Sequence, residues 1–556
     1  MVERKNEILS QLIDGVSRGQ VTRRQFMASA LRLGIAAPVA SSLATMARRG
    51  ALAGGAGSNG PRAYFQDGGK TLVVAIAQST VQLDPAIAGA NGYGDIIPIT
   101  GNLFEGLTRF KDDSAEIEPA LAESWTRSED GLSYVFKIRP GVTFHDGTPL
   151  DAKAVETNFL RQLDPNHPLH FEGITYAEIV FAEVAGVEAT GELELTIRLN
   201  RPIILVPGNL AMFAAGIASP TALEQYGLDF SQHAAGTGPF KLESWTKDVE
   251  LVFVANEDYW GGRPALDRVV WRTVAEDTVR VSELKTGGID IANQIDLKDV
   301  EDLQNDPNLQ VITGTYLNVQ FLGMNQTIPP FDNPKVRQAM QYAINKQNIA
   351  DVVFYGNYTL GAGPIAPGLP GYDPSLAEVY TYDPERAKAL LEEAGVSGLT
   401  FDLYNRTTSF WPLLGQLVQA DLAAIGVTAN LVSLEDAQFF AELNASRAPA
   451  FLNDWTWDNG DPDNVMYSLF TAPRAKTRLG YENPEVNRLN LQAQEEPDPE
   501  KRAEIYIQAQ RLILEDSIKV ILGYPSKAIG ASARVQNLKL SPTGNLFLRN
   551  VDLASE

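Results

Sequence analysis

A strand, a helix and a second strand follow one another between residues 399 and 434, and this order constrains the fold more than any other feature. Apolar and polar residues alternate over 399–403, as in a strand with one buried face. The segment 410–425 has helical spacing and is ended by Gly426, and 427–434 returns as a strand. A β-α-β unit makes a right-handed crossover between parallel strands. We therefore expect a mostly parallel sheet covered by helices.

Two further helices have clear start sites in the sequence. Asp332-Asn333-Pro334 precedes apolar residues at helical spacing, and Asp383-Pro384 precedes a second such run that ends at Gly395. An Asp or Asn before a helix, proline in its first turn and glycine after its end are the expected arrangement. These patterns predict helices that begin near residues 334 and 384.

Three other stretches indicate strands. Residues 72–77 form a continuously apolar run typical of a buried strand, whereas 132–139 and 192–199 alternate between apolar and polar side chains. Alternation leaves one face of a sheet in water, which suits an antiparallel or edge-exposed sheet. Together with the β-α-β unit, these strands predict a mixed α/β fold with several lobes.

The composition excludes several classes of protein. The chain has 556 residues, of which 44% are apolar, so it can bury the cores of roughly three to four domains. It has 69 acidic and 46 basic residues, and this net charge of −23 argues against binding to nucleic acid or to an anionic membrane surface. The absence of cysteine removes disulfides, thiolate metal sites, cysteine nucleophiles and a cysteine-linked lipid anchor.

The first 53 residues have the pattern of an export signal. The run TRRQFM at 22–27 contains paired arginines and precedes a mostly apolar stretch, 33–47, that is too short to cross a bilayer. Residues 51–53 offer an A-x-A cleavage site, and 54–67 are expected to form a flexible linker. We interpret 1–53 as a twin-arginine signal peptide, with an amphipathic helix of the fold as the alternative. This segment has eight basic and three acidic residues, so the rest of the chain has a net charge of −28.

Residues typical of catalysis are few. The chain has four histidines, His145, His167, His170 and His233. The pair at 167 and 170 has the spacing of metal ligands, but Pro168 indicates a loop there. No nucleophile with a nearby base is recognisable, although a histidine distant in sequence leaves a catalytic triad open. We therefore expect no enzymatic activity, no cofactor and no metal site.

One segment, 454–464 (DWTWDNGDPDN), is chemically dense. It contains four acidic residues and two tryptophans within eleven positions, with a turn at Gly-Asp-Pro. An indole face attracts a cation and a carboxylate binds an ammonium, so this combination suits a cationic, partly apolar ligand. An acidic surface turn with tryptophans in the core is the alternative interpretation.

Six short motifs follow one another in a fixed order along the chain. They are 119–125 (PALAESW), 141–150 (GVTFHDGTPL), 236–240 (GTGPF), 256–262 (NEDYWGG), 336–339 (VRQA) and 382–384 (YDP). In identity and order they resemble the extracytoplasmic solute-binding proteins of dipeptide, oligopeptide and nickel ABC importers. The resemblance spans residues 70–550, nearly all of the chain after the predicted signal.

The resemblance implies a two-lobed α/β fold, in which mixed sheets and an inserted subdomain form a clam that encloses its ligand. The first lobe would contain a discontinuous domain I, made of 68–112, 235–325 and 525–556, and an inserted domain II of 113–234. The second lobe would be domain III, residues 326–524.

The resemblance also implies one wall of the ligand site. In similar dipeptide-binding proteins, the aspartate before Asn-Gly holds the α-ammonium group of the ligand, which makes Asp458 the first candidate. Trp455, Thr456 and Trp457 are expected to line the same wall.

The resemblance also indicates a partner for the carboxylate end of the ligand. The similar proteins have an arginine before the helix of the β-α-β unit, and Arg406 matches it after a shift of one residue. Thr407 or Thr408 stands where those proteins have an aromatic residue. The first-lobe side of the cleft is expected after Leu83-Asp84-Pro85, at Gly89, Ala90, Asn91 and Tyr93.

A carrier is the function that the resemblance implies. The protein would capture di- or oligopeptides by hinge closure and deliver them to the permease subunits of an ABC importer, as a monomer that binds no nucleic acid. It would be exported by the twin-arginine machinery and remain in the periplasm or another extracytoplasmic space without a lipid anchor. The same scaffold binding a nickel chelate, an opine or an oligosaccharide is the alternative, and a secreted hydrolase is a third.

Overall fold

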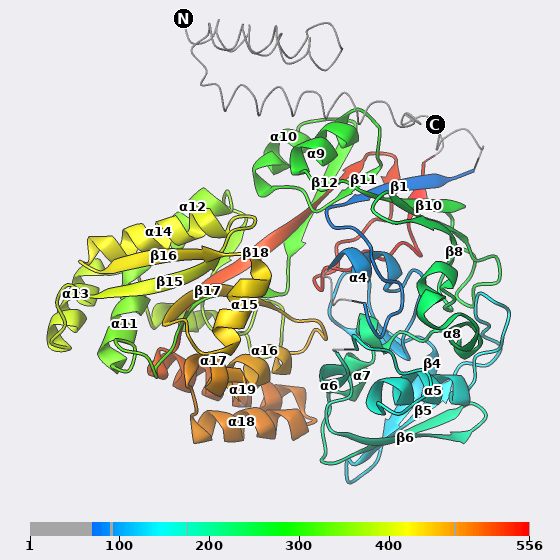
Figure 1. Ribbon diagram of the computed structural model, residues 1–556, viewed down its shortest axis with the longest axis horizontal. Coiled ribbons are helices and arrows are strands. Elements are labelled where there is room, and N and C mark those ends of the chain that lie inside the picture. Colours follow the sequence, from blue (N-terminus) through cyan, green and yellow to red (C-terminus); the bar gives the residue numbers. More distant parts are fainter. Residues whose placement is uncertain (1–68, 89–92, 175, 472–473, 555–556) are drawn as a thin grey trace, which may run out of the picture. The chain divides into compact units, whose positions relative to one another are not determined.

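The computed structural model describes residues 69–88, 93–174, 176–471 and 474–554 (Figure 1). The predicted signal peptide (1–53) and linker (54–67) lie outside the described residues and remain predictions. In the part of the chain that is described, no helix has the length and apolar character needed to span a membrane.

A long strand, β18 (Lys519–Ser532), connects the two halves of the main sheet (Figure 1). Residues 519–523 of β18 pair antiparallel with β13 (Asn318–Met324), whereas residues 526–532 pair with β12 (Leu309–Thr315). The sheet, twelve-stranded within the described residues, is thereby divided into two half-sheets that share one continuous strand.

Each half-sheet has its own set of strands. Beside β12, the first half-sheet contains β11 (Ile291–Asn293), β1 (Thr71–Ile76), β10 (Arg268–Thr273), β9 (Glu250–Ala255) and β8 (Phe240–Thr246). Beside β13, the second contains β14 (Tyr358–Leu360), β17 (Ala450–Thr456), β15 (Thr400–Arg406) and β16 (Thr428–Leu434). We call the residues on the first half-sheet the first lobe (69–315 and 526–554) and those on the second the second lobe (318–525).

The strand pairing places the crossing between the lobes at residues 316–317 and between residues 525 and 526. Strand β13 falls within the residues predicted for domain I, yet it pairs with β17 and β18 in the second lobe. The predicted limits of the three domains themselves remain a prediction.

Most of the apolar run predicted at 72–77 lies in β1 (Thr71–Ile76), whose six residues are all buried, and Ala77 follows the strand. β1 is parallel to both of its neighbours, β10 and β11, in the middle of the first half-sheet. The prediction of a buried strand is confirmed, since a strand covered on both faces has no need of polar alternation.

The alternating stretches form a separate antiparallel sheet in the first lobe. Its order is β4 (Ala122–Arg127), β5 (Ser133–Ile138), β7 (Glu194–Leu199) and β6 (Val184–Gly191), and helix α5 (Ala152–Leu163) packs on β6 and β7. The alternating apolar residues of β5 and β7 are buried, as predicted. Leu132 differs from the prediction, because it precedes β5 and is 38% exposed.

The predicted β-α-β unit is confirmed in the second lobe. β15 and β16 are parallel, and helix α14 (Trp411–Ala424) packs on both of them. The predicted helix starts are also confirmed: α11 (Pro334–Ala343) and α13 (Pro384–Glu393) are capped by the side chains of Asn333 and Asp383. Each cap accepts a hydrogen bond from a backbone N–H of the first turn, which would otherwise have no partner.

Other helices cover the sheets. They are α4 (Tyr93–Ile99), α6 (Ala177–Val180), α7 (Val206–Asn209), α8 (Pro220–Tyr226), α9 (Asp277–Lys285), α10 (Val300–Gln304), α12 (Lys346–Val353), α15 (Asp436–Asn444), α16 (Asp463–Phe470), α17 (Arg474–Leu479), α18 (Pro484–Glu495) and α19 (Pro499–Asp516). Strand β13 shows how the second half-sheet is covered on both faces. Its residues Val319 and Phe321 belong to one hydrophobic core, and Leu322 and Met324 belong to another.

Candidate ligand-binding site

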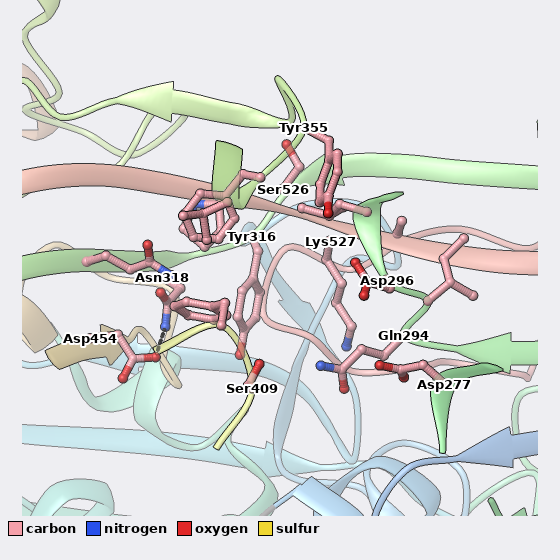
Figure 2. A pocket seen from close by; sticks show the side chains of 18 of the residues that line it. Asp277, Gln294, Asp296, Tyr316, Asn318, Tyr355, Ser409, Asp454, Ser526 and Lys527 are labelled. Atoms are coloured by element: carbon pink, nitrogen blue, oxygen red, sulfur yellow. Dashed lines mark hydrogen bonds between the residues drawn. The ribbon is translucent and has the colours of Figure 1, made fainter. Parts of the chain in front are cut away.

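A cavity of about 570 Å³ lies where the chain crosses between the two lobes (Figure 2). We call it the interlobe cavity. The first lobe contributes Ile97, Asp277, residues 294–297 and part of β18, and the second contributes the start of β13, the end of β17 and residues around α12 and α14. Its volume lies within the range of about 300–1,000 Å³ that is usual for small-molecule sites.

The second-lobe side of the cavity has an apolar wall. Phe354 and Tyr355 follow α12, and Phe410 and Leu413 lie at the start of α14. The rings of Phe354 and Phe410 are 5.1 Å apart in an edge-on arrangement. Tyr355 is 53% exposed and Leu413 is 40% exposed, so this wall can still bury apolar surface of a bound molecule.

The carboxylates that line the cavity already have cationic partners. The pairs are Asp454 with Arg406, Asp296 with Lys298, and Asp277 with Arg280. The Arg406 Nη2 atom donates to Asp454 Oδ1 at 2.5 Å, and the Lys298 Nζ atom is 2.5 Å from Asp296 Oδ2. The three cations are not themselves lining residues, so the acidic groups of the wall are compensated from the surrounding protein.

Lys527 lines the cavity without an acidic partner among the described residues (Figure 2). Its Nζ atom donates to the carbonyl oxygen of Gly544 at 3.0 Å and lies 5.7 Å from the centre of the Tyr316 ring. Burial lowers the pKa of this ammonium to about 8. Because an ammonium has three N–H donors and Gly544 accepts one, the group can bind an anion as well.

Asp458 follows β17 in the loop that leads to α16. The backbone N–H of Trp457 donates to the carbonyl oxygen of Leu317 at 3.0 Å, and this bond fixes the start of the loop. The Asp458 carboxyl is half-buried and has no hydrogen-bond or ion-pair partner among the described residues. Burial therefore raises its pKa to about 7.

The same loop contacts the first lobe. Asn459 Nδ2 donates to Asn209 Oδ1 at 2.9 Å. Gly460 has a φ of +65°, and a Cβ atom on it would lie 2.8 Å from the Cβ of Ala115. A glycine is needed here because the backbone is left-handed and the opposite lobe is close. Asp458 is thus carried by a loop that touches both lobes.

The neighbours of Asp458 have different surroundings. Thr456 lines the interlobe cavity, and its hydroxyl accepts from Asn318 Nδ2 at 2.9 Å. Trp455 is half-buried and donates from Nε1 to Asn464 Oδ1 at 2.6 Å. Trp457 is completely buried in a core of the second lobe, so its ring packs the protein rather than the cavity wall.

Arg406 ends β15 beside β17. Its guanidinium is 4.2 Å from the centre of the Trp411 ring and is paired with Asp454. Thr407 is exposed, and its hydroxyl donates to Glu435 Oε1 at 2.9 Å. The guanidinium that we predicted for a ligand carboxylate is therefore already engaged by a carboxylate of the protein.

The predicted first-lobe side is described only in part. Gly89, Ala90 and Asn91 lie outside the described residues, and Tyr93 is the first residue of α4. The chain just before them is anchored by Asp84, whose two carboxylate oxygens accept from Arg161 at 2.6 and 2.8 Å. Both side chains are buried, at 3% and 0% exposed, so this end of the loop has a fixed position.

His145 and His170 hydrogen-bond to backbone groups of the protein. His145 accepts from the N–H of Gly236 at 3.1 Å and lies 3.0 Å from the carbonyl oxygen of Gly238, and burial lowers its pKa to about 4. His170 Nδ1 lies 2.8 Å from the carbonyl oxygen of Arg161. The described residues contain no group of three or more acidic or histidine side chains placed to hold a metal ion.

Few residues that line the cavity were recognised from the sequence. Among those that were not are Tyr316, Asn318 and Lys527. They belong to the two segments that cross between the lobes, which are more than 200 residues apart in the chain. Lys527 could have been noticed, because it is a charged residue within the otherwise mostly apolar run 518–531.

Comparison with known proteins adds independent information. Residues 116–477 match the family described as bacterial extracellular solute-binding proteins, family 5 middle. Heme-binding protein A of Haemophilus influenzae is 32% identical over 509 residues, which cover 85% of this chain and 90% of the relative. Di/tripeptide-binding protein 2 of Pseudomonas aeruginosa is 32% identical over 498 residues, covering 85% of this chain and 93% of the relative.

A solved structure shares the fold. The ABC transporter-associated periplasmic binding protein DppA of Helicobacter pylori, in complex with the peptide STSA, matches with a TM-score of 0.73 and 30% identity. The match covers 87% of this chain and 98% of that protein.

Proposed function

Because the chain belongs to the bacterial extracellular solute-binding proteins of family 5, we propose that it is the substrate-binding component of an ABC importer and captures di- or oligopeptides. The ligand would be enclosed between the lobes and delivered to the permease subunits in the membrane. Two relatives of comparable similarity support a peptide ligand, since one is a di/tripeptide-binding protein and the other was solved with a bound peptide.

The observation that carries this proposal is the unpartnered carboxyl of Asp458. A partly buried carboxylate without a donor is unfavourable, and the described residues supply none. The α-ammonium of a peptide offers three N–H donors and a positive charge. A charge-assisted hydrogen bond of this kind contributes about 1.5–3 kcal/mol, which corresponds to roughly 10–100-fold in affinity.

The remaining contacts of the proposed site surround Asp458. Thr456 and Trp455 would line the ligand on the second-lobe side, and the segment Gly89, Ala90, Asn91 and Tyr93 would face it from the first lobe. Backbone groups of an extended peptide are the same in every sequence, so contacts to them allow capture of many peptides.

Hinge closure has a structural basis in direct contacts between the lobes. Asn459 bonds to Asn209, and the N–H of Ile204 donates to the carbonyl oxygen of Gln494 at 2.9 Å. Arg201 of the first lobe also pairs with Glu495 of the second, at 3.5 Å. A ligand that touches both lobes binds the closed arrangement better than an open one, and this difference in affinity is the cause of closure.

We further propose that the protein is exported through the twin-arginine pathway and acts as a monomer outside the cytoplasm. The paired arginines at 23 and 24 before an apolar stretch support this route. With no cysteine in the chain, a cysteine-linked lipid cannot anchor it.

A thermal-shift screen followed by titration calorimetry tests the proposal. Dialanine, trialanine, a nickel–histidine chelate and maltotriose are compared, since a ligand at 100 times its Kd stabilises the folded state by about 2.7 kcal/mol. We expect a peptide to stabilise the protein and Asp458→Asn to weaken its binding at least tenfold. Asp402→Asn is the matched control, because Asp402 is exposed on β15. Stabilisation by the chelate or sugar alone, or unchanged peptide affinity in Asp458→Asn, would contradict the proposal.

A further inference from the structure

The interlobe cavity contains a cation whose charge the protein leaves uncompensated. Among the described lining residues, Lys527 is the one basic side chain, and no described carboxylate lies within ion-pair distance of it. We propose that Lys527 binds the C-terminal carboxylate of the peptide, an assignment that rests on the proposed function and specifies how the same ligand is recognised.

The charges of the cavity favour an anionic partner at this point. The three lining aspartates are each paired with an arginine or lysine outside the lining, so none is available to Lys527. A buried or half-buried ammonium without a counter-ion is unfavourable, and a carboxylate placed beside it removes that cost. Lys527 is the cation that the described lining leaves without an ionic partner, and Asp458, in the loop after β17 and outside the lining, is a carboxyl without one. A zwitterionic peptide supplies the complement of both.

The position of Lys527 is fixed by its surroundings. Lys527 pairs with Gly314 in the register of β12 and β18, immediately beside the crossing between the lobes. One N–H of the ammonium is held by the carbonyl oxygen of Gly544. Gly544 has a φ of +84°, and a Cβ atom there would lie 3.0 Å from the Tyr316 ring and 3.6 Å from the ammonium. A glycine at 544 therefore suits the left-handed backbone and the close Tyr316 ring, and its carbonyl oxygen holds one N–H of the lysine while the remaining N–H groups can turn toward the cavity.

Arg406 is less suited to the same task. Its guanidinium donates to Asp454 and lies over the Trp411 ring, and a bound carboxylate would have to compete with an existing ion pair. Binding to Lys527 requires no such exchange, since the carbonyl oxygen of Gly544 occupies only one of its donors.

The assignment also indicates what the last side chain of the peptide meets. Lys527 and the apolar residues Phe354, Tyr355, Phe410 and Leu413 line the same cavity. A peptide whose carboxylate is bound by Lys527 therefore has its C-terminal side chain in the same cavity as this wall. We expect leucine or phenylalanine at the last position to be preferred over aspartate, because only an apolar side chain gains from burial there.

The test compares alanyl-alanyl-phenylalanine with its C-terminal amide on the wild-type protein and on Lys527→Met. The wild type should bind the acid at least tenfold more tightly than the amide. Lys527→Met should bind the acid 10–100-fold more weakly and the amide within about twofold of the wild type, so that the preference disappears. Lys285→Met is the matched control, because Lys285 pairs with Asp302 at the surface, away from the cavity lining, and should leave both affinities unchanged.

The two proposals fail in different ways. If Lys527→Met keeps the preference for the acid, Lys527 does not bind the carboxylate, although peptide capture stands. If the wild type binds neither form, nor any other di- or tripeptide acid, both proposals are overturned. N-acetylation of the peptide removes its ammonium group and so tests the contact with Asp458 separately. It should weaken binding by the same factor in the wild type and in Lys527→Met.

Discussion

Removing the charge of Asp458 should make the ligand-free protein more stable while it impairs binding. The carboxyl has an ordinary pKa of 3.8 when solvated and a pKa of about 7 in the folded protein, because burial disfavours its ionised form. The folded state therefore holds a proton more tightly than the unfolded state. Ionisation of this group then destabilises the fold as the pH rises from about 4 to 7.

The size of the effect follows from the shift. Each pKa unit corresponds to about 1.4 kcal/mol, so roughly three units give an upper value of about 4 kcal/mol at pH 8, and about 1–2 kcal/mol at pH 5. Asparagine has nearly the same shape and does not ionise, so Asp458→Asn recovers this free energy. With an unfolding entropy of about 2.1 cal/mol/K per residue, a cooperative unit of this size gains roughly 4 °C in Tm at pH 8.

Thermal unfolding of the ligand-free proteins at pH 5 and pH 8 measures this difference. The increase in Tm for Asp458→Asn over wild type should be two- to threefold larger at pH 8 than at pH 5. Asp402→Asn, which changes an exposed carboxylate, should show no such increase. An Asp458→Asn protein that is no more stable than wild type at pH 8, or that gains equally at both pH values, would refute the argument that Asp458 is buried without a partner.

Three other predictions concern a buried ion pair near the site, a hydrogen bond between the lobes and the pH dependence of binding. Arg161→Met should cost about 3–5 kcal/mol in a denaturant titration, because it leaves buried Asp84 without its partner; a loss below 1 kcal/mol would argue that the pair is solvated. Asn459→Ala should weaken peptide affinity about three- to tenfold and expand the ligand-bound protein in small-angle scattering, because it removes the interlobe bond to Asn209. Peptide affinity should fall about fivefold from pH 8 to pH 6 in calorimetry, because protonation of Asp458 near pH 7 costs roughly tenfold and the gain of charge on Lys527, whose pKa is about 8, returns roughly twofold; a flat profile would count against the role of Asp458.

The parts of the fold that sequence predicted well are those determined by neighbouring residues. The caps at Asn333 and Asp383 depend on a side chain and a backbone N–H only two or three positions away. The alternation of β5 and the β-α-β unit likewise depend on spacing within one segment. Leu132 marks the limit of such patterns, since alternation does not show at which residue the strand begins.

The interlobe cavity could not be predicted in the same way. Tyr316 and Lys527 become neighbours because β18 changes its partner from β13 to β12 in the middle of the strand. That change depends on the arrangement of two half-sheets, which no local pattern in the run 519–532 shows. Trp457 is similar: its place beside Asp458 in the sequence suggested the ligand wall, whereas its ring is completely buried in a core of the second lobe.

Ionic partners, rather than residue types, distinguish the charged groups that we propose for ligand binding from those that stabilise the protein. Asp454 and Arg406 have the chemistry of ligand-binding groups, but each compensates the other, and a ligand would have to break an existing ion pair to use either. Asp458 and Lys527 have no ionic partner in the described residues, so the protein bears their desolvation until a ligand binds. A peptide that binds both groups recovers this free energy only when the lobes are closed around it. The same two uncompensated charges can therefore provide both recognition of a zwitterionic ligand and the difference in free energy that drives closure.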